Sequence, residues 1–170
     1  MDLAVERVLW AVDAGEEVCI YGDYDVDGVS SIAVLSSVLQ AYGLSPSCFV
    51  PHRSGEGYGL SDGGVARCLR ENPTVSLLIS VDCGTVSNDA IDELAKKGIE
   101  TVVVDHHEMG TVGRPNCVAL VNPKSVEDKR GYLCAAGVVF KLAHALLKQR
   151  PLPGFDLKQV LDLVAVATIS

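Results

Sequence analysis

The sequence predicts an α/β fold with a mostly parallel, five-stranded sheet and helices on both of its faces. Short runs rich in β-branched residues alternate along the chain with longer helical patterns, which is typical of βαβ units. The chain has 170 residues, a length that suits one compact domain. Hydrophobic residues make up 48% and charged residues 21% of the sequence, so disorder and a coiled coil are both excluded.

Five short apolar runs predict the strands. Each is rich in Val, Ile, Leu or Ala and lies between segments that carry Gly, Pro, Asp or Ser, the residues that favour turns. Aromatic residues make up only 5% of the chain, so we expect aliphatic side chains to cover the sheet. The predicted strands are Val18–Asp23, Ser47–Pro51, Ser76–Asp82, Glu100–Asp105 and Ala119–Val121.

The longer segments between and around these strands predict the helices. One of them starts at Ser87 with acidic residues in its first turns and ends before Gly98, a pattern typical of helix ends. Two prolines and a glycine within Arg150–Gly154 separate the last two helices. The predicted helices are Leu3–Ala14, Val29–Tyr42, Ser61–Glu71, Ser87–Lys97, Ala135–Gln149 and one from Asp156 towards the end of the chain.

The net charge and the cysteines limit the class of protein. The formal net charge is -8, which should repel a polyanion and excludes a simple basic protein that coats DNA. The six cysteines form no C-x-x-C pair, so we expect free thiols in a reducing compartment instead of a zinc ribbon or a disulfide framework. No apolar run approaches the ~20 residues that a membrane span needs. We therefore expect a cytoplasmic protein with no membrane partner.

Three of the predicted strands end in aspartate. Asp23, Asp82 and Asp105 each follow an apolar run directly, and the carboxyl ends of parallel strands meet at one edge of a sheet. A single aspartate at such a place is often only the cap of the next helix. Three carboxylates in one crevice repel one another unless a cation lies between them. This pattern therefore predicts a cation site.

Residues 23–28 read D-Y-D-V-D-G and form the densest acidic segment. They match the start of a calcium-binding EF-hand loop, but Val34 stands at the twelfth position, where a bidentate Glu is required. Asp25 and Asp27 would also suit the nucleophile and the acid/base of an aspartyl phosphatase. The third interpretation is a two-metal site, in which alternating carboxylates bind hard cations and a water between them is activated.

A second segment supplies imidazole groups. The run D-H-H at 105–107 contains two of the four histidines of the chain and lies at the end of a predicted strand. A lone histidine is more often structural. Two in succession beside strand-end carboxylates favour a metal site, in which one ring binds the ion and the other donates to a phosphate or supports the first ring.

Together these residues resemble a known family, the DHH phosphoesterases. The run D-H-H at 105–107 is the signature after which the family is named, and the segment 23–28 together with Asp82 matches its first two motifs. The resemblance extends from about Val18 to the end of the chain. It implies a Rossmann-like catalytic domain.

Two further segments are similar to those of one subgroup of this family, the single-strand-specific exonucleases. They are V-P-H-R followed by E-G-Y-G-L within 50–60, and A-G-V-V-F-K-L at 136–142. We expect substrate contacts at one residue in each segment. Arg53 lies in the first, beside glycines that suit an anion-binding loop, and Gly137 lies in the second.

The resemblance also implies two divalent ions, usually Mn²⁺ and alternatively Mg²⁺, with Asp82 bridging them. Many members of the family have a histidine where this chain has Tyr21, and Asp23 is the expected substitute ligand. His107 would contact the scissile phosphate or support the metal ligands, and Asp105 would orient a neighbouring imidazole. The expected metal ligands are Asp23, Asp25, Asp27, Asp82 and His106.

The implied activity is metal-dependent hydrolysis of a phosphodiester, in which an activated water attacks phosphorus in line. For the single-strand-specific subgroup, the substrate and partner would be single-stranded DNA, degraded from 5′ to 3′ in DNA repair and recombination. A phosphoesterase that acts on oligonucleotides, cyclic dinucleotides or polyphosphate would share every metal residue. An aspartyl phosphatase and a non-catalytic nucleotide-binding module are the remaining alternatives.

Residues 1–170 are expected to form the catalytic domain in a truncated form. In the family the last metal-binding aspartate follows a segment like 162–170, and a second domain closes over the active site. This sequence stops before both. We therefore expect the isolated chain to be inactive or very weakly active.

Overall fold

A computed structural model describes residues 1–111, 113–125 and 131–170. Within these residues, the centre is a five-stranded sheet in the order β2-β1-β3-β4-β5, in which all neighbouring strands are parallel. The strands are β1 (Val18–Gly22), β2 (Ser47–Phe49), β3 (Leu77–Val81), β4 (Glu100–Val104) and β5 (Ala119–Val121). The predicted α/β class and the parallel sheet are confirmed.

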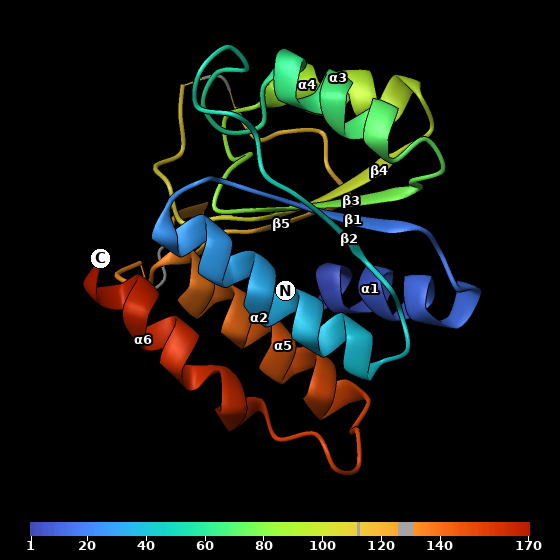
Figure 1. Cartoon of the computed structure of the whole chain (residues 1–170), viewed down its shortest axis with the longest axis vertical. Helices are drawn as coiled ribbons and strands as arrows, with labels where there is room; N and C mark the ends of the chain where they lie inside the picture. The colour runs from blue at the N-terminus through green and yellow to red at the C-terminus, as the bar shows by residue number, and fades with distance from the viewer. Residues whose placement is uncertain (112, 126–130) are drawn as a thin grey trace.

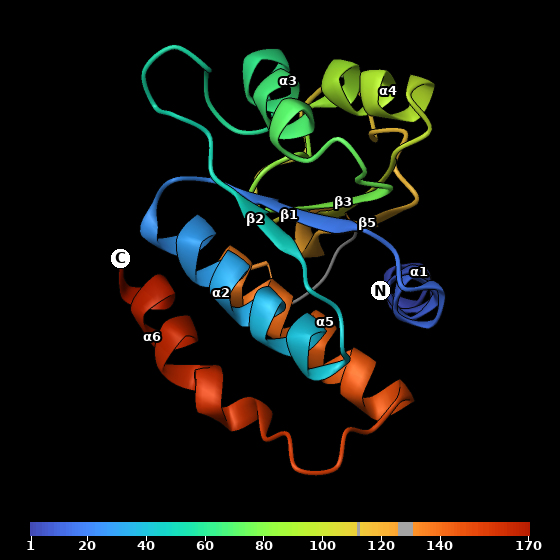
Figure 2. The same cartoon turned by 45° about the vertical axis from the view of Figure 1, so that its right-hand side comes forward.

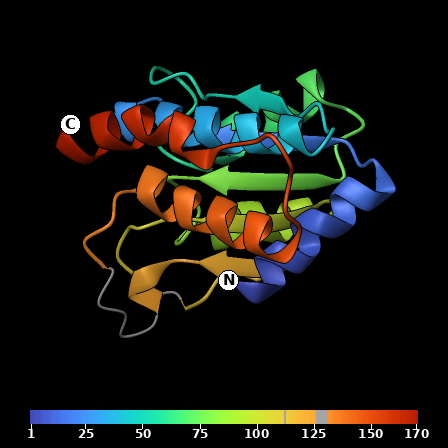
Figure 3. The same ribbon diagram turned by 90° about the horizontal axis from the view of Figure 1, so that it is seen from below.

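Helices cover both faces of this sheet. They are α1 (Asp2–Ala14), α2 (Val26–Ala41), α3 (Asp62–Glu71), α4 (Asn88–Lys96), α5 (Ala135–Gln149) and α6 (Leu161–Ile169), with short 3₁₀ turns η1 (Pro123–Ser125) and η2 (Leu157–Val160). In Figures 1 and 2, α3 and α4 lie above the sheet, and α1, α2 and α5 lie below it. α6 forms an outer layer against α2 and α5 (Figure 3). No helix in the described parts of the chain is long and apolar enough to cross a membrane.

Two apolar clusters join the helices to the sheet. The larger cluster lies between the sheet and α1, α2 and α5, and includes the fully buried Ile20, Leu35 and Leu142. The smaller cluster lies under α3 and α4 and includes Tyr21 and Leu94. Successive strand residues point to opposite faces, so Ile20 and Tyr21 enter different clusters. Because both faces are covered, the strands are continuous apolar runs.

Two helix starts differ from the prediction by more than one residue. α2 begins three residues before the predicted Val29, because the Asp25 carboxylate accepts a hydrogen bond of 2.9 Å from the Gly28 N–H and caps the helix inside the acidic segment. The last helix begins only at Leu161, because the segment that Asp156 caps forms a 3₁₀ turn first. The acidic segment is therefore half loop and half helix.

The register of the sheet brings three strand ends together. Gly22 of β1 pairs with Val81 of β3, which pairs with Val104 of β4. The next residue of each strand is an aspartate, and all three leave the sheet at the same edge, as the sequence predicts. These residues are Asp23, Asp82 and Asp105.

The start of α2 packs directly on the end of β1. A Cβ atom at Gly28 would collide with the backbone carbonyl of Asp23. Neither segment can move aside alone, because Asp23 continues a buried strand and Gly28 belongs to a capped helix. A residue without a side chain is therefore required at this position.

We expect Gly28→Ala to destabilise the protein by about 2–3 kcal/mol, because the added methyl group overlaps backbone atoms. Urea denaturation followed by circular dichroism measures the loss. Gly63→Ala in α3 is the matched control, since the nearest atoms would lie 3.4 Å from its added Cβ. The control should be neutral or stabilising by up to about 1 kcal/mol. Equal losses in both variants would contradict the expected close contact.

Candidate metal centre

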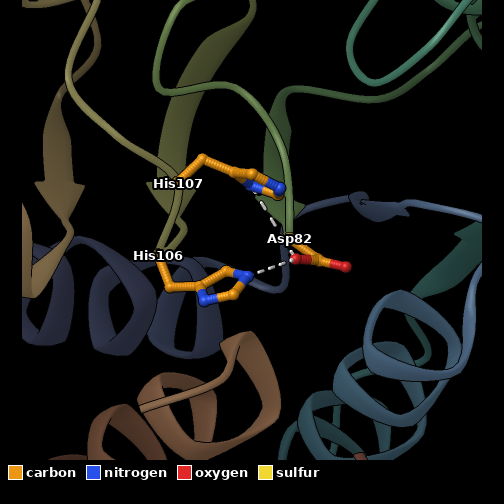
Figure 4. A group of neighbouring side chains, drawn as sticks. All are labelled: Asp82, His106 and His107. Carbon is orange, nitrogen blue, oxygen red and sulfur yellow. Dashed lines mark ion pairs between the residues drawn. The ribbon is translucent and has the colours of Figure 1, made fainter. Parts of the chain in front are cut away.

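Asp82 lies at the centre of the strand-end cluster. It follows β3 directly, is only 1% exposed, and has a φ of 59°. Among the described residues, it is the only one other than glycine with a positive φ. Aspartate tolerates this left-handed conformation better than most residues. The tight turn brings its carboxylate close to the side chains that follow β4 (Figure 4).

Asp82, His106 and His107 form the first group of potential ligands. Asp82 Oδ1 lies 3.3 Å from His106 Nε2 and 4.0 Å from His107 Nδ1, and both rings approach the carboxylate from the loop after β4 (Figure 4). One ligand atom from each residue lies within 4.8 Å of the other two. This spacing suits a cation bound by the Asp82 carboxylate and the His106 imidazole, with the His107 ring beside them.

Asp23, Asp25 and Asp82 form a second group, whose ligand atoms also lie within 4.8 Å of one another. Asp82 belongs to both groups, so its carboxylate lies between two potential cation positions. Among the described residues, Asp82 Oδ1 and Asp23 Oδ2 are buried and accept no hydrogen bond of good geometry, although the His106 ring lies 3.3 Å from Asp82 Oδ1. A buried oxygen without a partner is costly, and a divalent ion would remove that cost. The carboxylate oxygens, which make up most of the donor set, suit Mn²⁺ and Mg²⁺.

The buried position of Asp82 among other carboxylates changes its pKa. Burial raises the pKa of Asp82 to about 7; the neighbouring His106 lowers it in part, and the carboxylates of Asp27 and Asp25 raise it. The same contact acts on the imidazole, because the Asp82 carboxylate raises the pKa of His106. Proton and metal would therefore compete for one buried carboxylate.

Asp105 positions the two histidines through hydrogen bonds. Its Oδ2 accepts the Thr85 N–H at 3.0 Å, and its Oδ1 accepts the N–H groups of His106 and His107 at 2.7 and 3.2 Å. Burial raises the pKa of Asp105, but hydrogen bonds from His107 and Thr85 outweigh burial and hold that pKa well below its usual range. The ionised carboxylate only accepts, so His107 Nδ1, 2.8 Å away, donates to it. His107 Nε2 lies 3.5 Å from the Tyr58 hydroxyl.

Asp27 is engaged by the start of α5. Its Oδ2 accepts the Ala135 N–H at 2.7 Å and its Oδ1 accepts the Ala136 N–H at 2.8 Å. These are the first amides of the helix, where the helix dipole favours a negative charge. Asp27 Oδ2 also lies 3.6 Å from His106 Nε2. Of the five expected metal ligands, it alone falls outside both groups of clustered ligand atoms.

Asn122 is a residue of this site that the sequence analysis missed. It is 4% exposed, and its Nδ2 donates to Thr85 Oγ1 and to the His107 carbonyl, both at 2.9 Å. Its Oδ1 accepts the Lys124 N–H at 2.8 Å. Asn122 follows β5 directly, just as the aspartates follow β1, β3 and β4. The same pattern of a polar residue at a strand end could have identified it.

The remaining expected residues lie around the cluster. Arg53 is exposed in the loop after β2, with its guanidinium carbon 5.5 Å from the centre of the Tyr24 ring. Gly137 is buried in the first turn of α5, where a Cβ would lie 3.3 Å from the Leu133 side chain. Tyr21 points into the smaller core cluster and away from the carboxylates. Asp23 lies in the cluster itself.

The fold and this site define a class of protein. The family model "DHH family, N-terminal domain" matches residues 17–168, and the chain belongs to the DHH family. It is 36% identical over 172 residues to the single-stranded-DNA-specific exonuclease RecJ of Bacillus subtilis, covering all of this chain but 21% of the relative.

Solved structures of RecJ are also similar. A crystal structure of exonuclease RecJ bound to manganese matches with a TM-score of 0.86 and 34% identity over 98% of this chain and 41% of that one. RecJ of Thermus thermophilus in complex with Mn²⁺ matches with a TM-score of 0.79 and 30% identity, over 98% of this chain and 23% of that one. The chain therefore spans less than half of the RecJ chains that it matches.

We expect the metal-free protein to lose stability as the pH rises from about 4 to 8. The pKa of Asp82 is about 7 in the folded protein against 3.8 ordinarily, so the folded state holds this proton more tightly. Its stabilising contribution is lost as the pH rises through 7 and amounts to at most about 4 kcal/mol. The raised pKa values of His106 and His107 act in the same direction.

Asp82→Asn tests this assignment, because asparagine keeps the shape of the side chain and tolerates a positive φ. Urea denaturation in EDTA at pH 5 and pH 8 should show a smaller fall in stability for this variant than for the parent protein. An equal fall in both proteins would mean that Asp82 does not cause the pH dependence.

We expect Asn122→Ala to weaken Mn²⁺ binding by about 10–100-fold, because the loop that carries His107 loses its anchor. Isothermal titration calorimetry measures the affinity. Asn116→Ala is the matched control, since Asn116 is exposed and its side chain makes a single long hydrogen bond, 3.4 Å to Asp92. If Asn122→Ala binds Mn²⁺ as tightly as this control, the anchoring role is wrong.

Proposed function

We propose that this chain binds two divalent cations and hydrolyses phosphodiester bonds of single-stranded DNA, as the RecJ proteins that it resembles are named for doing. One observation carries the proposal: the buried carboxylate of Asp82 belongs to two groups of ligand atoms, each with a spacing that suits one cation. The similarity to RecJ structures with bound manganese supports Mn²⁺ as the ion, with Mg²⁺ as the alternative.

Each ligand of the proposed centre has a distinct place. Asp23 and Asp25 would hold one ion and His106 the other, with Asp82 between them. Asp27 is retained as a further ligand in the proposal, because a carboxylate oxygen that accepts one hydrogen bond keeps a second lone pair. Ions bound there would lower the pKa of a water and offset the charge that develops on the phosphate.

His107 and Asp105 would complete the catalytic residues. Asp105 accepts from Nδ1 of His107 and orients the ring, and Nε2 then lies beside the Tyr58 hydroxyl, 3.5 Å away. When protonated, that nitrogen can donate to a phosphate oxygen and stabilise the transition state. Arg53 and the start of α5 around Gly137 are the proposed substrate contacts, because both flank the carboxylate cluster.

The finer assignments rest on the likeness to RecJ. We propose digestion from 5′ to 3′, a role in DNA repair and recombination, and a cytoplasmic location. We also propose that residues 1–170 correspond to the DHH catalytic domain. Hydrolysis of short oligonucleotides, cyclic dinucleotides or polyphosphate is the alternative outcome of the assay below.

We expect the chain to bind two Mn²⁺ ions in calorimetry. Its cleavage of labelled single strands should be weak, as expected for a truncated catalytic domain, but at least about tenfold faster than that of duplexes under single-turnover conditions. Asp82→Asn should reduce the cleavage rate by about 1,000-fold, because both ions lose their shared ligand. Asp13→Asn is the control: Asp13 is an exposed aspartate near the end of α1, at the opposite edge of the sheet, and it pairs with Arg150.

Three results would contradict the proposal. Equal cleavage of single strands and duplexes would remove the single-strand specificity. Cleavage confined to dinucleotides or polyphosphate would mean that the chain is a phosphoesterase of another kind and not an exonuclease. Absence of Mn²⁺ binding, or unchanged cleavage by Asp82→Asn, would remove the two-metal mechanism.

A further inference from the structure

Hydrogen bonds and an ion pair tie the loop at 51–60, which reaches the metal centre at Tyr58, to the rest of the fold. Arg67 of α3 donates from Nε to Glu56 at 2.6 Å and from a terminal nitrogen to the Val50 carbonyl at 2.8 Å. The Glu56 carboxylate also accepts the His52 N–H at 2.7 Å. The middle of the loop is thereby tied to its start by a partly buried ion pair. Such bonds limit the conformations of the loop.

The end of the loop is fixed as well. The buried hydroxyl of Tyr21 in β1 donates to the Gly59 carbonyl at 3.0 Å. Tyr58 is the residue before this anchor, and its hydroxyl lies 3.5 Å from His107 Nε2. Its position beside the metal centre is therefore set by the sheet, and the ring needs little ordering when a ligand binds.

Two tyrosine rings and an arginine form an open corner at this place. Tyr58 is 62% exposed, and its ring lies at 84° to that of Tyr24, with the ring centres 6.3 Å apart. The Arg53 guanidinium carbon lies over the Tyr24 ring, 5.5 Å from its centre. In the described parts of the chain, Arg53 forms no ion pair with a carboxylate. We call Tyr24, Tyr58 and Arg53 the aromatic corner.

We infer that the aromatic corner binds a nucleobase of the substrate, and that this base stacks on the exposed ring of Tyr58. The base is the one next to the scissile phosphate. This inference rests on the proposed function and names its substrate class: nucleotide chains, in preference to base-free phosphate chains. A phosphate group does not stack on an exposed tyrosine ring, whereas every nucleobase has a π-face that can do so. The exposed guanidinium of Arg53 is suited to the adjoining phosphate.

The hydroxyl and the ring of Tyr58 suggest different roles, and they can be separated. If Tyr58 acted only by its contact with His107, Tyr58→Phe would be as damaging as Tyr58→Ala. If it acts by stacking, Tyr58→Phe keeps the base preference and Tyr58→Ala loses it. Trp10→Ala is the matched control for loss of an exposed aromatic ring, because Trp10 packs on Arg7, which binds Glu100 at the opposite edge of the sheet.

The test compares two fluorescent single-stranded oligonucleotides of equal length and charge, one with normal bases and one with abasic sugars throughout. Binding to the Mn²⁺-loaded chain is measured by fluorescence anisotropy at low temperature, with gels to confirm that the strands stay intact. We expect the parent protein, Tyr58→Phe and Trp10→Ala to bind the base-bearing strand about 5–100-fold more tightly. Tyr58→Ala should reduce this preference by about 5-fold or more.

Equal binding of the two strands by the parent protein would overturn the inference and leave the proposed function intact, since abasic strands still contain phosphodiesters. A preference that survives in Tyr58→Ala, or that is lost equally in Tyr58→Phe, would also overturn it. Binding of neither strand would overturn the proposed function together with the inference. Inorganic polyphosphate that competes as well as the base-bearing strand would assign the site to phosphate chains.

Discussion

Several carboxylates are buried together at one edge of the sheet, and the surrounding residues are arranged to stabilise their negative charge. Like charges repel strongly in a poorly solvated site, and each buried carboxylate needs donors or a cation. Asp105 receives four hydrogen-bond donors, and Asp27 receives two amides of α5. Within the described residues, Asp82 and Asp23 each keep a buried oxygen without a hydrogen bond of good geometry. Asp105 and Asp27 thus stabilise the frame of the site, whereas Asp82 and Asp23 keep oxygen atoms that could accept a cation.

The bond between Asp27 and α5 also links the two halves of the chain. Asp27 lies in the first turn of α2, and the amides that it accepts belong to residues more than a hundred positions later. The partial positive charge at the start of α5 offsets the carboxylate charge, while α2 and α5 pack against each other along their length. The Asp27 carboxylate thus helps to hold α5 against α2, and the same two hydrogen bonds offset its negative charge at the site.

The histidines and the aromatic corner are held in place by hydrogen bonds from residues that lie behind them. Asn122 holds the backbone of His107 from β5, whereas Tyr21 and Arg67 hold the loop that presents Tyr58. These supports come from strands and a helix, which are more rigid than the loops that they hold. Side chains from separate parts of the sequence are therefore held at spacings that one small substrate can bridge.

The sequence by itself determined the sheet, the helices and the aspartates at its edge, because an apolar run followed by Asp is a local pattern and parallel strands end at one edge. It placed the start of α2 three residues too late, since a capping bond from Asp25 competes with the loop that the acidic pattern suggested. Only the tertiary structure decided that Asp27 caps α5, that Asn122 anchors His107, and that Tyr24 and Tyr58 meet. Those contacts depend on how distant segments pack, and no local pattern of residues encodes that packing.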